Sequence, residues 1–417
     1  MKITVNCVIL LIATCSTGSL ASAHAGTVNG TAHAPIAIQS DADFVNCGCV
    51  TGGDGSQARP YIIGPLAVNK VSGIGISIDG TNLTKSFVIS NVTVAGNGSN
   101  SAIGIVLNHI NPTGAQRIVA QVTGKQTIVQ QLNTGILVQN SSYVTLDGSG
   151  ANLNGAGIVN SGAGTINHNQ SGAIDVENST NVVVKGWQLS ANGVSPVPDW
   201  ITLDPGLNYW GVGGVRFFGV TNSTIDHNAA NNCTSVSYSL FFSSHNLVTS
   251  NTADYPFTMN FLVTDGSSYN SLSGNVASTG DFIGYMVADP LPGTATLGAY
   301  GASHDNHFIE NISHTDGPTG AEIHANEVPA FLGGFLVLNG TYNNVIANNQ
   351  DWASTGSGFA WAQVVPNSTT PIGVTTYPPV LHCNVTASEG GGGVANLNGN
   401  VWQANTFKTI DPCLPPQ

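Results

Sequence analysis

The stretch Asn246-Leu-Val-Thr-Ser-Asn251 is followed by a near copy of itself, Asn270-Ser-Leu-Ser-Gly-Asn275. In both copies two asparagines enclose the hexapeptide and its third residue is apolar, which gives the template N-x-h-x-x-N. A segment that recurs along a chain marks a repeat architecture, in which each repeat is one structural unit. Further copies of the template begin at Asn306, Asn343 and Asn400.

Weaker copies precede these five. The copies that begin at Ser223, Asn246 and Asn270 are 23 and 24 residues apart, and we interpret this interval as the length of one coil. Longer intervals elsewhere leave room for loops between coils. The weaker copies are Ser86–Asn91 around Val88, Tyr143–Gly148 around Thr145, Asn181–Gly186 around Val183 and Ser223–Asn228 around Ile225.

A short segment of alternating apolar residues precedes most copies, and this alternation predicts a β-strand. One coil of two or three such strands cannot bury its own apolar face, but stacked coils form parallel sheets around a continuous core. We therefore predict an all-β parallel β-helix of roughly ten coils with a cap at each end. The predicted strands include Ile74–Ile78, Ile105–Leu107, Ile136–Val138, Ile174–Val176, Val215–Phe217 and Phe335–Val337.

The repeated asparagines have a structural explanation. Asparagine tolerates the left-handed backbone conformation of a tight corner, and its side-chain amide can bond the equivalent residue of the next coil. We predict such a ladder and assign the asparagines no chemistry.

The composition supports this fold and excludes several partners. Of 417 residues 51 are Gly, and only 7% are charged, which disfavours a helical protein. The formal net charge is −13, with 9 Lys plus Arg against 22 Asp plus Glu, and no segment gathers basic residues. Nucleic acids and anionic membrane surfaces are therefore poor partners.

The N-terminal residues have the features of an export signal. A lysine, a short apolar run and small residues before a cleavage point predict a secretory signal peptide, and no stretch is long enough to span a membrane. We expect a secreted protein, at the cell surface, outside the cell or in the periplasm. The predicted parts are 1–25 signal peptide, 26–60 N-terminal cap and lead-in segment, 61–410 β-helix and 411–417 C-terminal tail.

Five cysteines remain after cleavage of that peptide, and their pairing is open. A bridge between Cys383 and Cys413 would fix the C-terminal segment. Because five is an odd number, one of the cysteines cannot pair within the chain. We expect the short spacing between Cys47 and Cys49 to strain a direct bridge. The fifth cysteine is Cys233.

The ladder and the lead-in segment together resemble those of right-handed parallel β-helix proteins. The similarity is to the periplasmic copper-processing proteins of nitrous oxide reductase maturation and to the wider carbohydrate-binding and sugar-hydrolase β-helix group. It implies a right-handed coil, but this scaffold carries many activities, so it implies no single function. The residues that carry the resemblance are Asn246–Asn405, Ile38–Phe44, Gly52–Ser56 and Pro60–Ile63.

Known catalytic signatures of that group are missing. Lys185 and Arg216 are the one basic pair on neighbouring predicted coils, and Asp226 and His227 follow them; these four are weak catalytic candidates. The orientation of Arg216 depends on a one-residue choice of register, because Val215 with Phe217, or Phe218, can each face the core.

The longest irregular insertion, residues 188–214, predicts a loop that walls a groove. Its aromatic side chains can stack on sugar rings and its carboxylates can bond hydroxyl groups. An apolar cluster that fixes the loop to the sheet is the other interpretation. The candidate ligand-binding residues are Asp199, Trp200, Asp204, Tyr209 and Trp210.

Two histidines, His304 and His307, lie near a predicted corner and are weak metal candidates, because imidazole binds zinc and copper. Solvated corner histidines are the other interpretation, and we expect neither a metal nor a cofactor. The sequence thus predicts a secreted or cell-surface β-helix that binds a polysaccharide or cell-surface glycan, with no evident catalysis. The alternative is a polysaccharide lyase or glycoside hydrolase with a non-standard site beside the 188–214 loop.

Overall fold

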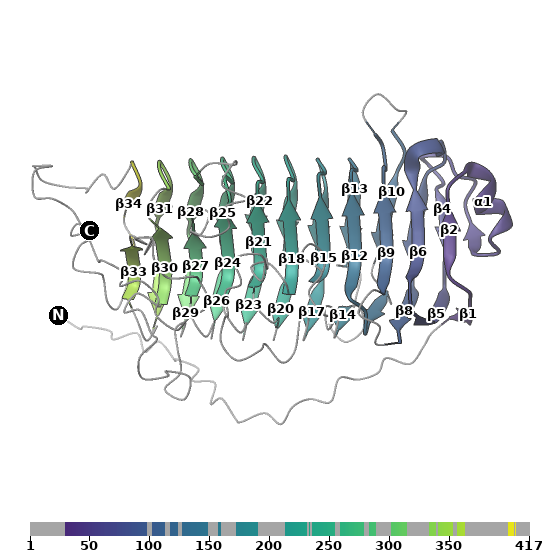
Figure 1. The fold of residues 1–417 in the computed structure, drawn as a ribbon, viewed down its shortest axis with the longest axis horizontal. Coiled ribbons are helices and arrows are strands. Elements are labelled where there is room, and N and C mark those ends of the chain that lie inside the picture. The colour runs from purple at the N-terminus through teal and green to yellow at the C-terminus, as the bar shows by residue number, and fades with distance from the viewer. Residues whose placement is uncertain are drawn as a thin grey trace, which may run out of the picture.

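The protein is a parallel β-helix, as the repeat predicts, and it is right-handed, as the resemblance implies (Figure 1). The computed structural model describes residues 30–97, 102–112, 117–123, 127–148, 157–159, 172–190, 213–231, 233, 236–254, 259–278, 283–288, 302–314, 333–338, 341–352, 357–362, 399–403 and 405. Within them, no helix combines the length and the apolar character that crossing a bilayer requires.

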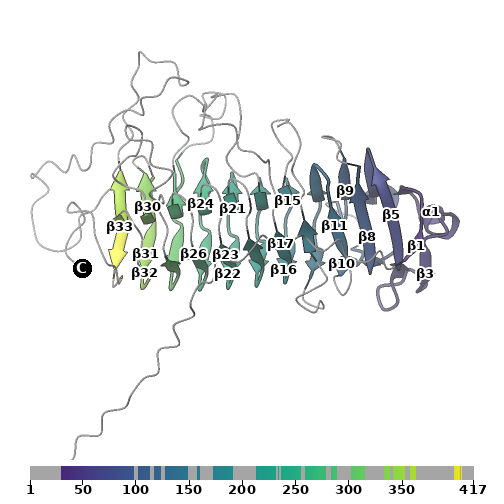
Figure 2. The same ribbon diagram turned by 90° about the horizontal axis from the view of Figure 1, so that it is seen from below.

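Three long sheets run the length of the molecule, and each takes every third strand of the chain (Figure 2). Sheet A consists of β1 (Thr31–Ala32), β5 (Leu66–Val71), β8 (Val92–Gly96), β11 (Ile128–Gln130), β14 (Gly157–Val159), β17 (Gln188–Ser190), β20 (Ala229–Asn231), β23 (Thr252–Asp254), β26 (Val276–Ser278), β29 (Ile312–His314) and β32 (Gln350–Trp352).

Sheet B has the longest strands, and it positions the candidate site. It consists of β2 (Ile36–Ile38), β6 (Ile74–Asp79), β9 (Ile103–Asn108), β12 (Thr134–Gln139), β15 (Gly172–Glu177), β18 (Gly213–Phe218), β21 (Val236–Phe241), β24 (Met259–Thr264), β27 (Ile283–Val287), β30 (Gly333–Leu338) and β33 (Ser357–Ala362).

Sheet C follows sheet B along each coil. It consists of β3 (Val50–Gly52), β4 (Tyr61–Ile63), β7 (Phe87–Ser90), β10 (Ala120–Thr123), β13 (Val144–Asp147), β16 (Val183–Lys185), β19 (Thr224–Asp226), β22 (Leu247–Thr249), β25 (Ser271–Ser273), β28 (His307–Ile309), β31 (Val345–Ala347) and β34 (Val401–Gln403). Every pairing between described strands is parallel except that of β3 with β4.

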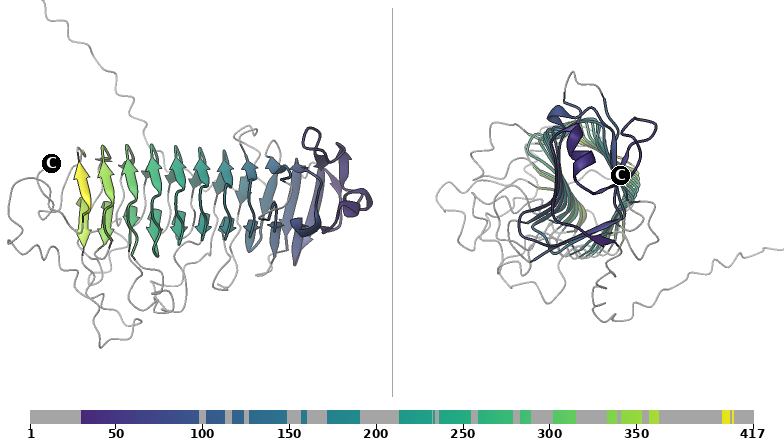
Figure 3. Two further views of the ribbon diagram at one scale, coloured as in Figure 1. Left: turned by 90° about the horizontal axis from the view of Figure 1, so that it is seen from above. Right: turned by 90° about the vertical axis from the view of Figure 1, so that its right-hand side faces the viewer.

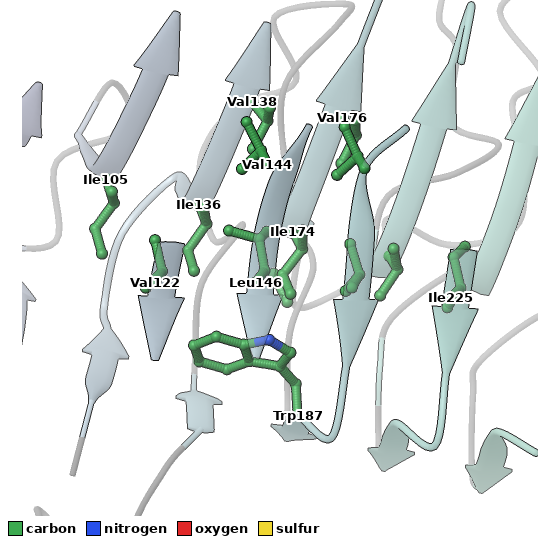
Figure 4. Close-up of a cluster of buried hydrophobic side chains, with 14 of the residues drawn as sticks. Ile105, Val122, Ile136, Val138, Val144, Leu146, Ile174, Val176, Trp187 and Ile225 are labelled. Carbon is green, nitrogen blue, oxygen red and sulfur yellow. The ribbon is translucent and has the colours of Figure 1, made fainter. Parts of the chain in front are cut away.

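Strands of one sheet stack in register, so equivalent side chains form rows along the axis. In sheet B, Ile105 pairs with Ile136 and Ile136 with Ile174, and all three are buried (Figure 4). Figure 4 shows these residues and Trp187 pointing into the space between the sheets. Stacking of coils therefore builds the apolar core that a single coil lacks.

Sheet B has two inward rows, and the one that contains Ile76 changes character along the molecule. This row is aliphatic near the N-terminus and aromatic from β21 onward, whereas the other row keeps aliphatic residues such as Leu240 and Val263 there. Successive rings stack almost parallel, with centroids 5.0, 4.7 and 4.5 Å apart. The rings belong to Tyr238, Phe261, Tyr285 and Phe335.

The predicted asparagine ladder exists, and it has two columns. Asn251 illustrates the pattern, because its Nδ2 donates to Oδ1 of Asn275 at 3.0 Å and to the carbonyl of Ile225 at 2.9 Å. Its backbone N–H donates to the same Asn275 oxygen. One column consists of Asn246, Asn270, Asn306, Asn344 and Asn400, and the other of Asn228, Asn251, Asn275, Asn311, Asn349 and Asn405.

Four of the repeat copies were placed one residue too early. The ladder runs through Asn344, with Ile346 facing the core, whereas Asn343 adopts a left-handed φ of 54° at the corner. Because side chains alternate with a period of two, a shift of one residue moves the wrong set inward. In the weaker copies Val88, Thr145 and Val183 likewise form an outward row, and Ile89, Leu146 and Val184 face the core.

The N-terminal end is covered by helix α1 (Asp41–Asn46), which lies across the end of the coil in the right-hand view of Figure 3. The Asp43 carboxylate accepts from the backbone N–H groups of Gln39 and Ser40, which completes a capping box. Phe44 is buried against Tyr61 and Phe87, with ring centroids 5.0 and 5.9 Å away. The helix thus closes the core at this end.

The expectation that Cys47 and Cys49 resist a direct bridge is wrong. The two residues form a disulfide with their Cα atoms 5.1 Å apart. Gly48 between them adopts a φ of +68°, a conformation that brings the flanking residues close and that glycine adopts without strain. Cys233 is buried, and its Sγ lies 3.9 Å from the carbonyl oxygen of Leu189.

Candidate functional site

The register of sheet B settles the orientation of Arg216. Val215 and Phe217 are 1% and 0% exposed and belong to the core, so Arg216 points to the outward face of the sheet. On that face Arg216 is paired in register with Asp175 of the neighbouring strand β15. A basic side chain and a carboxylate are therefore placed side by side by the stacking of two coils.

Arg216 holds two carboxylates. Its Nε and Nη2 donate to the two oxygens of Asp175, both at 2.8 Å, and Nη2 also donates to Glu177 at 2.8 Å. All three side chains are nearly buried, with 8%, 1% and 11% of the Arg216, Asp175 and Glu177 side chains exposed. We call Arg216, Asp175 and Glu177 the buried triad.

Burial raises the pKa of Asp175 to about 7. Removal from water is the largest cause, the attraction of Arg216 opposes it, and the charge of Glu177 adds to it. A carboxyl group that changes its protonation state near neutrality is a feature of functional sites, although structural ion pairs also show it.

The last residue of each sheet B strand extends the triad along the axis. Asp79, Asn108, Gln139 and Glu177 hold equivalent positions in four successive strands. Gln139 donates to the second oxygen of Glu177 at 2.6 Å, and Asn108 donates to Asp79 at 3.4 Å. Two amides thus lie between two carboxylates along an outward row.

The residue after each of the strands β9, β12 and β15 adopts a left-handed conformation. The φ values of His109, Asn140 and Asn178 are 51°, 48° and 46°. Asn140 is exposed and donates to Asn108 at 3.3 Å, and His109 contacts Asp79 at 3.5 Å. This second row lies beside the first and widens the polar surface.

Both rows become aromatic at the next coils. Phe218 and Phe241 continue the first row, and Phe242 continues the second after Gly219. The Phe218 ring meets Phe242 edge to face at 5.0 Å, and the Arg216 guanidinium lies 5.5 Å from its centroid. Phe242 has a φ of 48°, the left-handed conformation that the corner residues Asn140 and Asn178 also adopt.

We call this surface the polar band. It consists of Asp79, Asn108, His109, Gln139, Asn140, Glu177, Asn178, Phe218 and Phe242. The other two members of the buried triad, Asp175 and Arg216, lie beside it on the same face of sheet B.

Ser239 lies next to the buried triad. It pairs with Arg216 in the register of β18 and β21, and it is 0% exposed. Its hydroxyl has no hydrogen-bond partner within the described part of the chain. Since buried hydroxyl groups are nearly always paired, this one leaves bonding capacity for a water molecule or a ligand hydroxyl.

The four catalytic candidates from the sequence do not share one face. Arg216 lies on sheet B, whereas Lys185 and Asp226 are paired in register on sheet C. Lys185 forms an ion pair with Asp147 at 3.0 Å, and Asp226 contacts His227 at 2.6 Å. The basic pair proposed for lyase chemistry is therefore divided between two sheets.

The two weak metal candidates occupy a corner between sheets B and C. The His304 ring stacks on Tyr342 at 4.6 Å and contacts the Asp305 carboxylate at 2.6 Å, and His307 is exposed in β28. No group of three or more potential metal ligands occurs among the residues that the structure describes.

Other predictions lie outside the described residues. They concern the signal peptide 1–25, the candidate ligand-binding residues Asp199, Trp200, Asp204, Tyr209 and Trp210, the tail 411–417, and Cys383 with Cys413.

The sequence did contain a signal for the buried triad. Asp175 stands between Ile174 and Val176, and Arg216 stands between Val215 and Phe217, in two segments already recognised as strands. Aligning these segments as successive coils pairs the acid with the base. Glu177, Gln139 and Phe242 gave no such signal, because their proximity depends on intervals of different length between coils.

Comparison with known proteins assigns this chain no family and no function. No family model and no curated protein matches the chain. Among solved structures, the Dettilon tailspike protein is similar over 90% of this chain and 61% of its own, with a TM-score of 0.43 and 11% identity. This chain thus spans about three fifths of that tailspike.

Two further solved structures are similar at the same low level. An alginate lyase from Paenibacillus sp. str. FPU-7 has a TM-score of 0.43 and 11% identity over 79% of this chain and 97% of its own. A periplasmic alginate epimerase has a TM-score of 0.34 and 10% identity over 89% and 83%. Similarity at this level assigns this chain neither an activity nor a substrate.

Proposed function

We propose that the polar band binds a polysaccharide and that the protein is exported to do so. The observation that carries the proposal is the continuous outward row of carboxylate and amide side chains over four stacked strands, which ends at phenylalanine rings. The resemblance to copper-processing β-helices stays a prediction, and the proposed function of the band does not depend on it.

The chemistry of the band suits a chain of sugars. Amide groups donate and accept hydrogen bonds, and carboxylates accept them, so the row complements hydroxyl groups, which do both. Phe218 and Phe242 offer apolar ring surface for the C–H face of a sugar. The ion pairs of Arg216 fix Glu177 and, through the contact with Phe218, the start of the aromatic part.

Glycoside hydrolysis is a second candidate function, and the buried triad is the observation that favours it. Two carboxyl groups share one guanidinium nitrogen, and the pKa of Asp175 is raised to about 7, so one can act as an acid while the other stays ionised. Because the Asp175 side chain is only 1% exposed, binding is the better supported function.

A matched set of glutamines tests the binding surface. Gln121, Gln130 and Gln139 belong to one coil and are half-buried on the outward faces of sheets C, A and B. We expect Gln139→Ala to weaken polysaccharide binding about tenfold, the effect of losing a hydrogen bond or two. Gln121→Ala and Gln130→Ala are the controls. Affinity electrophoresis against a panel of polysaccharides measures the effect, and equal losses in all three variants would contradict the proposal.

The hydrolase candidate needs a separate measurement. Wild-type protein and Glu177→Gln are incubated with the polysaccharides that bind, and reducing ends are counted over time. Product formation that Glu177→Gln abolishes, with binding retained, would establish hydrolysis at the triad. Bound glycan that is never cleaved by the wild type would remove the hydrolase candidate and leave binding as the function.

A further inference from the structure

The charges of the polar band restrict the chemical class of its ligand. Asp79 and Glu177 stand on the outward row. Asp175 lies on the same face of sheet B, two residues before Glu177 in β15, and is buried. Among the described strands of sheet B, Arg216 is the single Lys or Arg, and its Nε and Nη2 already bond carboxylates. An anionic glycan placed on this row would therefore face carboxylates, and no Lys or Arg of these strands would be available to pair with the glycan's charges.

Arg117 is a described basic side chain at the corner between sheets B and C, and its guanidinium lies 3.8 Å from the centre of the Tyr143 ring. His109 belongs to the band, and its ring contacts the Asp79 carboxylate. Arg216 and Arg117 are thus both engaged within the protein, and no described Lys or Arg is a member of the band. A polyuronate or a sulfated glycan would therefore meet the Asp79 and Glu177 carboxylates without a cation that is available to pair with it, whereas an uncharged glycan meets no such repulsion.

The direction of the rows restricts how the ligand lies. Equivalent residues of adjacent strands are about 4.8 Å apart along the axis, close to the length of one sugar unit. The first row crosses β6, β9, β12 and β15 and reaches Phe218 on β18, so a chain parallel to the axis meets one side chain of this row at each coil. A chain that crosses the sheet meets one coil only.

The unpaired Ser239 hydroxyl points to a ligand as an independent observation. It is buried beside Arg216, in the coil where the band becomes aromatic. A neutral hydroxyl is the partner that this site can accept without burying another charge.

We infer that the ligand is an uncharged polysaccharide whose chain lies along the axis of the β-helix, from the coil of Asp79 to that of Phe242. This inference rests on the proposed function of the polar band, and it names the substrate class and the orientation of the bound chain.

The experiment compares neutral and acidic probes on the full-length protein. Laminarin, galactomannan, alginate and chondroitin sulfate are tested by biolayer interferometry in low salt and in about 0.5 M NaCl, which screens charges beyond a few ångströms. Neutral oligosaccharides of increasing length are tested in parallel. We expect a neutral probe to bind in both salts, with affinity rising until the chain has about six units, one for each coil from that of Asp79 to that of Phe242.

Three other results would each overturn something specific. Binding of acidic probes alone, lost in high salt, overturns the neutral class and leaves glycan binding intact. Neutral binding that stops rising at a disaccharide overturns the axial orientation. Absence of binding by any probe overturns the proposed function itself, and this inference with it.

Discussion

The two ends of this β-helix fill the same kind of interior with different side chains. From β6 to β18 the inward row of sheet B that contains Ile76 is aliphatic. It shares the core with residues of sheet A such as Val129 and Leu189. From β21 onward it is aromatic, and sheet A presents Ala230, Ala253 and Ala277. Large rings on one sheet are thus matched by small residues on another, so the core volume of each coil is kept.

The corners differ in the same way. The asparagine columns begin at Asn228 and Asn246, and the place before Asn228 is taken by Trp187, whose backbone N–H donates to the Asn228 oxygen. N-terminal to this point Val182 and Trp187 take the positions of the two asparagine columns, and the outward face of sheet B carries the polar band. Two continuous asparagine columns therefore hold the C-terminal coils together, whereas the N-terminal coils have apolar residues at those positions and single buried hydroxyl groups, such as those of Ser141 and Ser179, at another corner.

The largest expected effect tests the ladder directly. Asn275→Ala removes hydrogen bonds to Asn251, Asn311 and the carbonyl of Val248, and it leaves buried groups without partners. At 1–3 kcal/mol for each buried group, the free energy of unfolding falls by about 4 kcal/mol. In the N-terminal coils Ser179→Ala loses bonds to Ser141 and Glu177 and costs about 1 kcal/mol. Guanidinium unfolding measures both variants, and equal losses would remove the contrast between the two regions.

The next effect concerns the buried triad. Arg216→Met leaves Asp175 and Glu177 buried without their guanidinium, and breaking such a pair lowers the free energy of unfolding by about 3 kcal/mol at pH 7.5. The loss is smaller at pH 5, because Asp175 then takes up a proton. Unfolding curves at the two pH values test this. A loss that is independent of pH would show that the triad contributes by packing alone.

The pH dependence of the wild-type protein follows from the same residue. The pKa of Asp175 rises from 3.8 to about 7 on folding, so the folded state keeps a proton that the unfolded chain releases. The stabilisation is complete below about pH 4 and is lost as pH rises toward 7. Asp175→Asn removes this dependence, since the amide does not titrate. Thermal melts from pH 4 to 7.5 compare the two proteins, and identical slopes would contradict the prediction.

Residues at the N-terminal end act in the opposite direction. Hydrogen bonds from Thr84 lower the pKa of Asp41 despite its partial burial, and those from Gln39 and Ser40 lower the pKa of Asp43. Their contribution is present above pH 3.8 and is lost below it, so it does not overlap with the Asp175 window.

The smallest expected change in stability is at Phe242. Asparagine tolerates the left-handed conformation that Phe242 adopts at a φ of 48°, so Phe242→Asn shifts the free energy of unfolding by less than about 1 kcal/mol. Glycan binding falls nevertheless, because the edge-to-face contact with Phe218 and the apolar ring are lost. A binding assay beside a melt separates the two effects. Unchanged affinity would remove Phe242 from the band.

Most copies with asparagine at both ends are predicted in their observed register, as Asn246–Asn251 is, whereas most weaker copies are shifted by one residue. The Asn343 copy also has asparagine at both ends but is shifted, because a second asparagine stands beside the first. At Tyr143 and Asn181 the predicted template begins at the corner residue instead of the residue after it. Corner residues and ladder residues share the preference for asparagine, so composition alone does not separate them.

What the sequence determined by itself was the coil: its length, its alternating strands and its asparagine corners all arise from local chemistry that repeats. What only the tertiary structure decided was which side chains meet across coils. Arg216 and Asp175 are 41 residues apart, and Gln139 and Glu177 are 38 residues apart. Intervals between coils vary, so no fixed spacing brings these residues together, and their contacts exist only because each strand is hydrogen-bonded in register to the next.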